Sequence, residues 1–393
     1  MSSDPVVIVA AKRTPIGAFQ GVFSSASAPQ LGAAAIAGAI ADAGIAAADV
    51  DQVLMGCVLP AGLGQAPARQ AAISAGIPVG TAATTVNKMC GSAMMTIMLG
   101  HDLLRADSAS VVVAGGLESM SNAPYLLPKA RRGYRMGHQE VLDHMFCDGL
   151  QDPWQNQMMG HYADNTAEKY GFSREQQDAF AIESVSRAQA AVADGTFSAE
   201  IAAVTMTTRK GDVTVETDET PGTVSIDKIP TLRAAFKKDG TVTAATSSSI
   251  SDGAAATVLM TSSEAERREI EPLAHLVGHS SFAQEPAWFT TAPVAAINNL
   301  HRKLGWSPDD VDLYEINEAF AVVTMAAMQD IGIDHAKVNV NGGACALGHP
   351  VGATGARITT TLLYALRARN LKRGVASLCI GGGEAVAIGV ELT

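Results

Sequence analysis

Two cysteines, one histidine and one asparagine lie where layered α/β proteins commonly hold reactive groups. Cys90 stands in VNKMCGSAMM, just before a segment with helical spacing, and His349 stands in the small-residue loop NGGACALGHPVGATGAR. Cys379 ends the apolar run of SLCIGGG, and Asn317 follows another strand-like segment in YEINEAFA. Thiols and an imidazole at strand ends and in glycine-rich loops indicate covalent thiol chemistry assisted by a separate acid or base.

The sequence around Cys90 supports two interpretations equally. Unpaired N–H groups at the start of the following helix, and the dipole of that helix, favour a thiolate. Free cysteine is also among the most buried residue types, so Cys90 is equally consistent with a packing role. His349 has the same ambiguity, since it is either a proton acceptor near neutral pH or only a cap on the next helix. The glycines after Cys379 offer N–H groups that can stabilise an anion.

Strands and helices alternate along the parts of the chain that carry these residues. Apolar runs typical of buried strands occupy 5–17, 50–59, 108–120 and 250–262. The run within 108–120 leads directly into paired glycines. Helical spacing covers 30–45, where Gly44 is the expected end, and 65–77. This alternation predicts an α/β fold with a parallel or mixed sheet covered by helices on both faces.

Two longer-range patterns refine this prediction. Between 121 and 248 the alternation stops, except for one clear helix over 173–195 with Ser173 as N-cap, and we interpret this region as an insertion. A loop, a helix, a strand and a glycine pair recur in the same order after Cys90 and after His349. The recurrence indicates two similar halves whose loops meet near a pseudo-twofold axis.

Composition and charge exclude several classes of protein. The 393 residues carry a formal charge of −11, which argues against nucleic acid as a partner. The start of the chain has the pattern of a strand and not of a signal peptide, and no apolar run approaches the roughly 20 residues of a membrane span. The five cysteines show no CxxC spacing, so neither a metal site nor a disulfide framework is expected. We therefore expect a cytoplasmic protein that has no contact with a membrane.

Five segments in order resemble the motif set of thiolases, especially its acetyl-CoA C-acyltransferase members. They are NKMCGSAM, GGLESMS, NEAFA, NGGACALGHPVGATGAR and CIGGG, and the resemblance extends over essentially the whole chain. It implies a layered α/β/α/β/α fold of two βαβαβαββ halves with an inserted loop domain, usually in a homotetramer built as a dimer of dimers. The corresponding division is 1–120 plus 249–270 for the first half, 121–248 for the loop domain and 271–393 for the second half.

The resemblance also implies catalytic roles for five residues. Cys90 accepts the acyl group, His349 activates it, and Cys379 exchanges the α-proton of the second acyl-CoA. Asn317 orients a water that forms one oxyanion hole with His349, while the N–H groups of Cys90 and Gly381 form the other. The implied reaction is reversible condensation of two acetyl-CoA, or thiolysis of a 3-ketoacyl-CoA. Acyl-CoA and CoA are substrates, and no tightly bound cofactor is expected.

A second group of positions is implied to bind the substrate. These residues are Ser248, Ala244, Met158, Leu150, Phe289, Ala319 and Phe320. Three of them depart from the usual family pattern, because Met158 replaces a histidine, Phe289 replaces a methionine and Ser248 stands in an altered run, ATSSS. The CoA phosphates are expected at basic residues of the insertion, any of which is equally consistent with a solvated surface: Lys129, Arg131, Arg132, Arg135, Lys237 and Lys238.

Three other functions remain open on the sequence alone. A cysteine-dependent hydrolase of thioesters or peptides needs only one cysteine with His349. A non-catalytic carrier of CoA or lipid needs neither thiol. A decarboxylating condensing enzyme shares the layered fold, but such enzymes are expected to lack a second cysteine like Cys379. The acyl chain length and the physiological direction of the reaction are not determined by the sequence.

Overall fold

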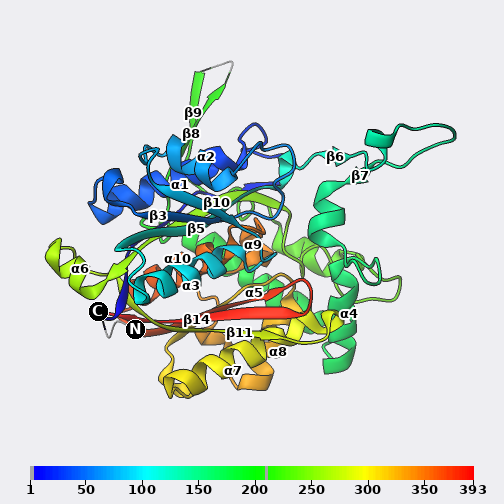
Figure 1. Cartoon of the computed structure of the whole chain (residues 1–393). Helices are drawn as coiled ribbons and strands as arrows, with labels where there is room; N and C mark the ends of the chain where they lie inside the picture. The colour runs from blue at the N-terminus through cyan, green and yellow to red at the C-terminus, as the bar shows by residue number, and fades with distance from the viewer. Residues whose placement is uncertain (1–3, 209–210) are drawn as a thin grey trace.

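The computed structural model describes residues 4–208 and 211–393, and a long path of strands organises the fold (Figure 1). The strand order is β12-β13-β14-β11-β1-β10-β5-β3-β4, with β2 beside β10. The first-half strands are β1 (Val6–Arg13), β2 (Gly17–Ala18), β3 (Gln52–Gly56), β4 (Ala82–Val86), β5 (Val111–Ser119) and β10 (Ser251–Thr261). The second-half strands are β11 (Ala274–Ala283), β12 (Leu313–Ile316), β13 (Arg373–Ile380) and β14 (Glu384–Leu392). Parallel pairs join β3 to β4, β3 to β5 and β12 to β13, so the sheet is mixed, as predicted.

Helices form three layers that alternate with the strands (Figure 1). The outer layer of the first half contains α1 (Ala28–Ala43) and α2 (Pro67–Ser74). The central layer contains α3 (Ser92–Arg105) and α10 (Thr354–Ala368), which pack against each other. The outer layer of the second half contains α7 (Ala292–Leu304) and α8 (Ala321–Ile331). The shorter α6 (Ser262–Arg267) and α9 (Ala344–Leu347) lie in connections. This is the layered α/β/α/β/α arrangement expected from the sequence.

Local sequence accounts for the ends of several helices. Ser27 caps α1 through the Gln30 N–H, and Gly44 ends the helix with a φ of 65°, which a residue without Cβ adopts freely. Ser173 caps α5 (Arg174–Ala193) as predicted, because its side chain accepts from the Gln176 N–H while the Gln176 side chain accepts in return.

The internal duplication is visible in three dimensions. In each half a loop leads into a central helix and then a strand, through α3 and β5 in the first half and α10 and β13 in the second. The two central helices approach most closely at their first turns, where Gly355 of α10 lies against the backbone of Met94 in α3 and leaves no room for a Cβ. The loops that precede these helices therefore meet, as the duplication predicts.

The paired glycines after the apolar part of 108–120 belong to β5 and do not form a turn. Gly115 lies against the carbonyl of Ala255 on β10, and Gly116 lies against the carbonyl of Gly352. A Cβ at either position overlaps these backbone atoms. The glycines therefore let β5 pass close to two other backbones.

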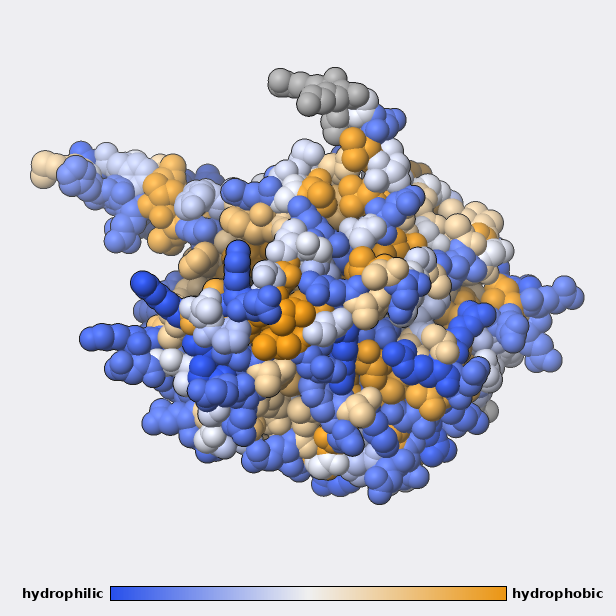
Figure 2. All heavy atoms as spheres, turned by 180° about the vertical axis from the view of Figure 1, so that it is seen from behind, coloured by the Kyte–Doolittle hydropathy of each residue, from blue (hydrophilic) through white to orange (hydrophobic). Residues whose placement is uncertain are grey.

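The region between 121 and 248 carries little of the main sheet. It contains α4 (Met159–Tyr170), α5, the strand pair β6 (Tyr125–Leu126) and β7 (Leu142–Asp143), and the hairpin of β8 (Val204–Thr208) and β9 (Gly211–Val215). The segment that joins β6 to β7 extends away from the body as an arm, and the β8–β9 hairpin also projects (Figure 1). Figure 2 shows this arm from behind, with apolar side chains among the hydrophilic ones. No helix within the described residues is both long and apolar enough to span a bilayer.

Candidate active site

Cys90 lies in a tight turn immediately before α3. Met89 has a φ of 47°, which turns the chain so that Cys90 leads directly into the helix cap at Gly91. The Ser92 hydroxyl accepts from the N–H of Lys88 at 2.8 Å and donates to the carbonyl of Met89 at 2.6 Å. These two bonds, together with an ion pair between Lys88 and Glu384, hold the cysteine loop in place. The serine after Cys90 therefore shapes the turn.

The thiol of Cys90 is protonated in this resting structure. Burial raises its pKa to about 11, although the N–H groups of Gly381 and of Cys90 itself face the sulfur and act in the opposite direction. The negative charge of buried Glu118 raises the pKa further. The N–H contacts at the helix start lower the pKa, as expected, but desolvation outweighs them, so the pKa of the resting thiol is raised overall.

Cys379 and Gly381 come from the other half of the fold and lie beside Cys90. Cys379 is fully buried, and its pKa is raised well above the ordinary thiol value by desolvation and by the proximity of Cys90. Gly91, next to Cys90, packs so closely on Ile380 that no Cβ fits between them. The structure thus brings together two thiols that are far apart in the sequence, with the Gly381 N–H directed at the first.

His349 is held as a neutral imidazole with one free nitrogen. The Thr354 hydroxyl donates to the carbonyl of Pro350 at 3.0 Å, so it accepts from the His349 Nδ1–H, with 2.6 Å between the heavy atoms. Nε2 therefore carries the lone pair, and it has no hydrogen-bond partner within the described part of the chain. Burial and the charge of Arg357 lower the pKa of His349 to about 3. The ring is a proton acceptor with a defined tautomer.

Asn317 also presents unused hydrogen-bonding groups. Its residue is 1% exposed, and neither Oδ1 nor Nδ2 has a partner among the residues that the structure describes. Its backbone is fixed, because the Asn317 N–H donates to the Ser377 carbonyl at 3.0 Å. A buried amide without a protein partner is costly, and the cost is relieved by a bound water or by substrate. The arrangement suits the water-orienting role predicted for this side chain.

Two buried carboxylates that were not predicted as site residues hold the loops around these groups. Glu118 accepts from the N–H groups of Val58 at 2.9 Å, Leu59 at 3.1 Å and Gly352 at 2.9 Å, and burial raises its pKa to about 7. It ties the loop after His349 to the end of β3. Its place in the GGLESMS motif, at the end of a buried strand, is the only sequence signal for this role.

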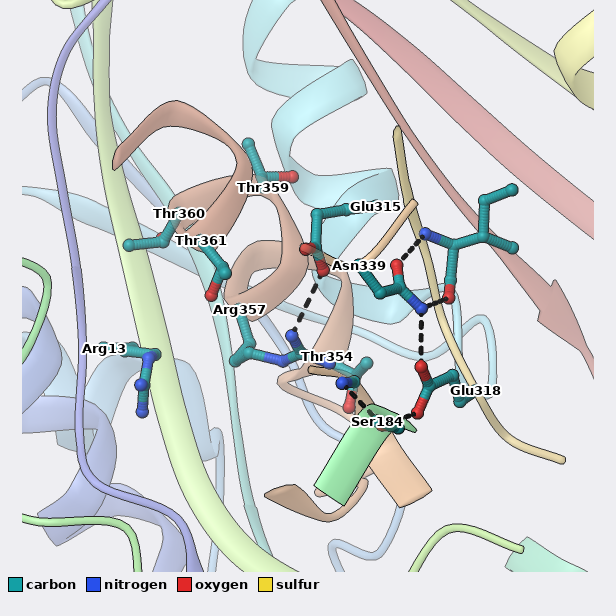
Figure 3. A network of polar contacts seen from close by, with 12 residues as sticks. Arg13, Ser184, Glu315, Glu318, Asn339, Thr354, Arg357, Thr359, Thr360 and Thr361 are labelled. Atoms are coloured by element: carbon teal, nitrogen blue, oxygen red, sulfur yellow. Dashed lines mark hydrogen bonds and ion pairs between the residues drawn. The ribbon is translucent and has the colours of Figure 1, made fainter. Parts of the chain in front are cut away.

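Glu318 performs a similar task in the second half (Figure 3). It accepts from the Ser184 hydroxyl at 2.7 Å, from Asn339 Nδ2 at 2.8 Å and from the Cys345 N–H at 3.0 Å. Burial raises the pKa of Glu318, and that of the adjacent Cys345 thiol is raised well above its ordinary value. Cys345 is therefore a packing residue, and Glu318 positions the base of the His349 loop.

The predicted substrate residues divide between two apolar clusters around the thiols. Phe289, Ala319 and Phe320 pack in the same cluster as Cys379, with the rings of Phe289 and Phe320 6.4 Å apart. Ser248 joins this wall, because its N–H and hydroxyl both bond to the Ala319 carbonyl, at 3.0 and 3.1 Å. Leu150 packs in the cluster that contains Cys90, together with Val58, Leu59 and Val351.

The two remaining predicted positions lie outside these clusters. Met158 is partly buried at the N-cap of α4, where it bridges to Gln151. Ala244 is exposed within a turn closed by hydrogen bonds between Thr243 and Thr246. Both belong to the inserted region, whose backbone runs past the clusters without adding these side chains to them.

The basic residues considered for the CoA phosphates occupy two separate places. Lys129 and the arginines at 131, 132 and 135 lie on the exposed segment between β6 and β7, which forms the projecting arm (Figure 1). Lys237 and Lys238 instead line a surface hollow of about 630 Å³ between α4 and the 237–241 loop, where Lys237 bonds to Asn165. The neighbouring Phe236 packs against Phe320, so this second pair lies close to the aromatic wall of the site.

The comparisons with known proteins agree with this geometry. Residues 6–263 match the family model described as "Thiolase, N-terminal domain", and residues 270–392 match "Thiolase, C-terminal domain". The chain is 48% identical over 386 residues to an acetyl-CoA acetyltransferase of Pseudomonas aeruginosa, covering 98% of both chains. It is 45% identical over 393 residues to an acetyl-CoA acetyltransferase of Schizosaccharomyces pombe, covering 100% of both.

A solved structure supports the same assignment. The crystal structure of the Bacillus anthracis acetyl-CoA acetyltransferase superposes with a TM-score of 0.97 at 39% sequence identity, and the match covers 99% of each chain. Three observations lead to one conclusion. The family models together cover nearly the whole chain, the relatives have the same length, and the two similar halves bring the paired thiols together. The chain belongs to the thiolase family.

Proposed function

We propose that this thiolase catalyses the reversible transfer of an acetyl group between CoA thioesters, joining two acetyl-CoA to acetoacetyl-CoA and CoA. One observation carries the proposal: the two halves of the fold bring the buried Cys379 thiol beside the partly buried Cys90 thiol, with Gly91 packed on Ile380 and Cys90 close enough to raise the pKa of Cys379. A hydrolase needs only one such thiol. A carrier needs none, and the names of the relatives, acetyl-CoA acetyltransferases, support the substrate.

Thiolysis of acetoacetyl-CoA is proposed to start with Cys90 and Cys379 protonated and His349 neutral, the states that their shifted pKa values favour. The Cys90 sulfur attacks the distal keto carbon while its proton passes to His349 Nε2, which has a free lone pair. The carbon–carbon bond then breaks, which leaves acetyl-Cys90 and the enolate of acetyl-CoA. The protonated Cys379 thiol donates its proton to that enolate, and acetyl-CoA leaves.

The second half of the reaction restores the enzyme. CoA binds with its thiol, the Cys379 thiolate removes that proton, and the resulting CoA thiolate attacks the acetyl carbon. The bond to Cys90 breaks, the leaving sulfur recovers its proton from the His349 imidazolium, and a second acetyl-CoA forms. Condensation follows the same steps in reverse. Because one product leaves before the second substrate reacts, ping-pong kinetics are expected.

Two oxyanions form in this scheme and each has its own donors. We assign the N–H groups of Cys90 and Gly381 to the oxyanion that develops when Cys90 attacks the keto carbon or when its acetyl group is attacked by CoA. Both face the sulfur already, so they need no rearrangement. We assign a water held by Asn317, together with His349, to the enolate oxygen, which agrees with the unpartnered amide of Asn317. Removing one such donor typically costs about 3 kcal/mol of transition-state stabilisation.

The substrate is proposed to lie between the two apolar clusters. Leu150 and Met158 contact it from the insertion, while Phe289, Ala319 and Phe320 surround the acyl group. Ser248 and Ala244 line the pantetheine, and Lys237 and Lys238 are the preferred partners for the phosphates because they lie near the aromatic wall. The buried rings of Phe289 and Phe320 favour a short acyl chain.

The remaining features of the proposal concern cofactors and assembly. The reaction scheme draws on groups of the chain and on CoA as a substrate, without a tightly bound cofactor. The arm exposes apolar side chains, with Met136 92% and Tyr125 69% exposed, which supports a homotetramer assembled through the arms. Five free cysteines support a reducing, cytoplasmic location. Light scattering at several protein concentrations measures the assembly.

A pair of variants tests the proposed reaction. Cys379→Ala is expected to accept an acetyl group from acetyl-CoA on Cys90, seen by mass spectrometry, but to lose condensation and thiolysis. Cys90→Ser is expected to lose acetyl-enzyme formation and turnover together. Wild-type thiolysis in Cys379→Ala, or release of free acetate as the main product, would instead establish a hydrolase. The specificity constants for 3-ketoacyl-CoA of increasing length, with CoA present, are expected to fall steeply beyond four carbons.

A further inference from the structure

Two histidines and an aspartate converge on one point far from the paired thiols. His101 and Asp102 lie near the C-terminal end of the central helix α3, and His279 lies on β11 in the other half of the fold. His101 Nδ1 lies 2.9 Å from Asp102 Oδ1, and His279 Nε2 lies 3.0 Å from the same oxygen. The three ligand-type atoms all fall within 4.8 Å of one another.

This spacing is close to that of a metal-binding site. Ligand atoms bonded to a tetrahedral zinc at about 2.0–2.1 Å are separated by about 3.3 Å. The two nitrogen–oxygen distances here are only a few tenths of an ångström shorter. The imidazole rings meet edge to face, with 5.1 Å between their centroids, so both nitrogens point toward the carboxylate without stacking of the rings. Each imidazole thus directs one nitrogen at the same carboxylate oxygen.

The surroundings of the three residues allow both access and binding. They line a surface hollow of about 600 Å³ to which His275 and Lys303 also contribute. Both imidazole side chains are 16% exposed and the Asp102 side chain is 58% exposed, so two ligands are held by packing while the third faces water.

Neighbouring charges limit how tightly a cation binds. Lys303 Nζ donates to the His279 carbonyl at 3.1 Å, and Arg105, which also lines the hollow, donates to the Asp4 carbonyl at 3.0 Å. These two positive charges oppose a cation, while Asp102 attracts it. Two imidazoles and a carboxylate suit zinc and related transition metals better than magnesium or calcium, which prefer oxygen ligands.

We propose that His101, Asp102 and His279 form a binding site for a divalent transition-metal cation, with water completing its coordination. The metal joins the end of α3 to β11 and thereby links the two halves of the fold. At about 1.5 Å per residue, His101 lies about 15 Å along α3 from the turn that holds Cys90. The site is therefore separate from the proposed reaction, and its occupancy stabilises the fold without taking part in acyl transfer.

Zinc titration of the metal-free, full-length protein tests this site. Calorimetry is run on the wild type and on four variants: His279→Gln, Asp102→Asn, His138→Gln and Cys90→Ser. His138→Gln removes an exposed histidine of the arm, and Cys90→Ser removes a thiol that also attracts zinc. We expect the wild type to bind one equivalent of zinc per chain. The affinity of this site should fall at least about tenfold in His279→Gln and Asp102→Asn and should be retained in the two controls.

Thermal unfolding provides a second readout. Zinc is expected to raise the Tm of the wild type and of His138→Gln but not that of His279→Gln, because only a cation bound to the native state stabilises it. The Tm of each variant without metal shows that it has folded. Equal zinc affinity in all proteins, no binding to the wild type, or loss of binding only in Cys90→Ser would each overturn the proposal.

Discussion

Removing the hydroxyl of Thr354 is the most direct test of how His349 is held in the tautomer that accepts a proton. Its hydrogen is committed to the Pro350 carbonyl, so its oxygen accepts the Nδ1–H of His349 and leaves Nε2 free. Thr354→Val keeps the volume and the branched shape while removing the acceptor. The Nδ1–H is then buried against a methyl group, or the proton moves to Nε2, where it blocks the transfer from Cys90.

The size of the effect follows from the hydrogen bond that is lost. A buried donor without a partner costs about 1–3 kcal/mol. If the imidazole escapes this cost by changing its tautomer, the active form becomes the less stable one by a similar amount. At about 1.36 kcal/mol per tenfold change in rate, kcat/KM for thiolysis is expected to fall by about 5-fold to 150-fold. The decrease should appear in kcat, because Thr354 is assigned no contact with the substrate.

Thr359 provides a matched control on the same helix. It is also fully buried, and its hydroxyl also donates to the carbonyl four residues earlier, that of Gly355, at 2.8 Å. Thr359→Val therefore removes a similar helix bond without affecting His349. Acetoacetyl-CoA thiolysis gives the rates, nitrogen NMR of labelled histidine gives the tautomer, and Thr354→Ser should restore both. Equal rates for the two valine variants would refute the assignment.

Three further predictions concern protonation, charge and packing. The thiolate absorbance of Cys90 is measured as the difference between the wild type and Cys90→Ser. It should be nearly absent at pH 7 and should rise about tenfold per pH unit toward the pKa of about 11. A step in this absorbance near pH 6 would contradict a protonated resting thiol. Asp218→Ala should lower the unfolding free energy in denaturant by about 3–5 kcal/mol, because Asp218 bonds to the buried guanidinium of Arg13 at 2.7 and 2.9 Å; a change below about 1 kcal/mol would contradict this. Gly355→Ala should lower the Tm, since its Cβ overlaps the backbone of Met94 where α3 and α10 meet, and an unchanged Tm would show that the helices separate without cost.

The sequence was sufficient for the layered fold and for the residues that approach one another at the paired thiols. The apolar runs and glycine ends around Cys90 and Cys379 recur in each half, and loops that precede equivalent helices must meet when such halves pack together. Gly355, which lies against Met94, shows the contact that this symmetry requires. Asn317 was indicated by its place after a strand-like segment, whereas the position of Ser248 followed only from motif order.

Other features depend on sums of interactions that no short segment contains. The pKa of Cys90 reflects burial, two N–H contacts and the charge of Glu118, and the helix start alone predicted the N–H contribution but not the larger effect of burial. The tautomer of His349 depends on whether the Thr354 hydroxyl is already committed to another acceptor. His279 approaches Asp102 across 177 residues, so counting metal-ligand spacings along the chain could not detect the cluster.

The protonation states of the site explain why the backbone N–H groups of Gly381 and Cys90 face a neutral thiol. A charged Cys90 would be expensive in this apolar setting, and a charged His349 would be even less favourable beside Arg357. Keeping both neutral until a thioester arrives means that the first negative charge develops on the attacked carbonyl oxygen, for which we assign the Gly381 and Cys90 N–H groups as donors. The desolvation that suppresses the resting thiolate also strengthens those contacts once the oxyanion forms. Burial therefore opposes ionisation of the free enzyme but favours the transition state.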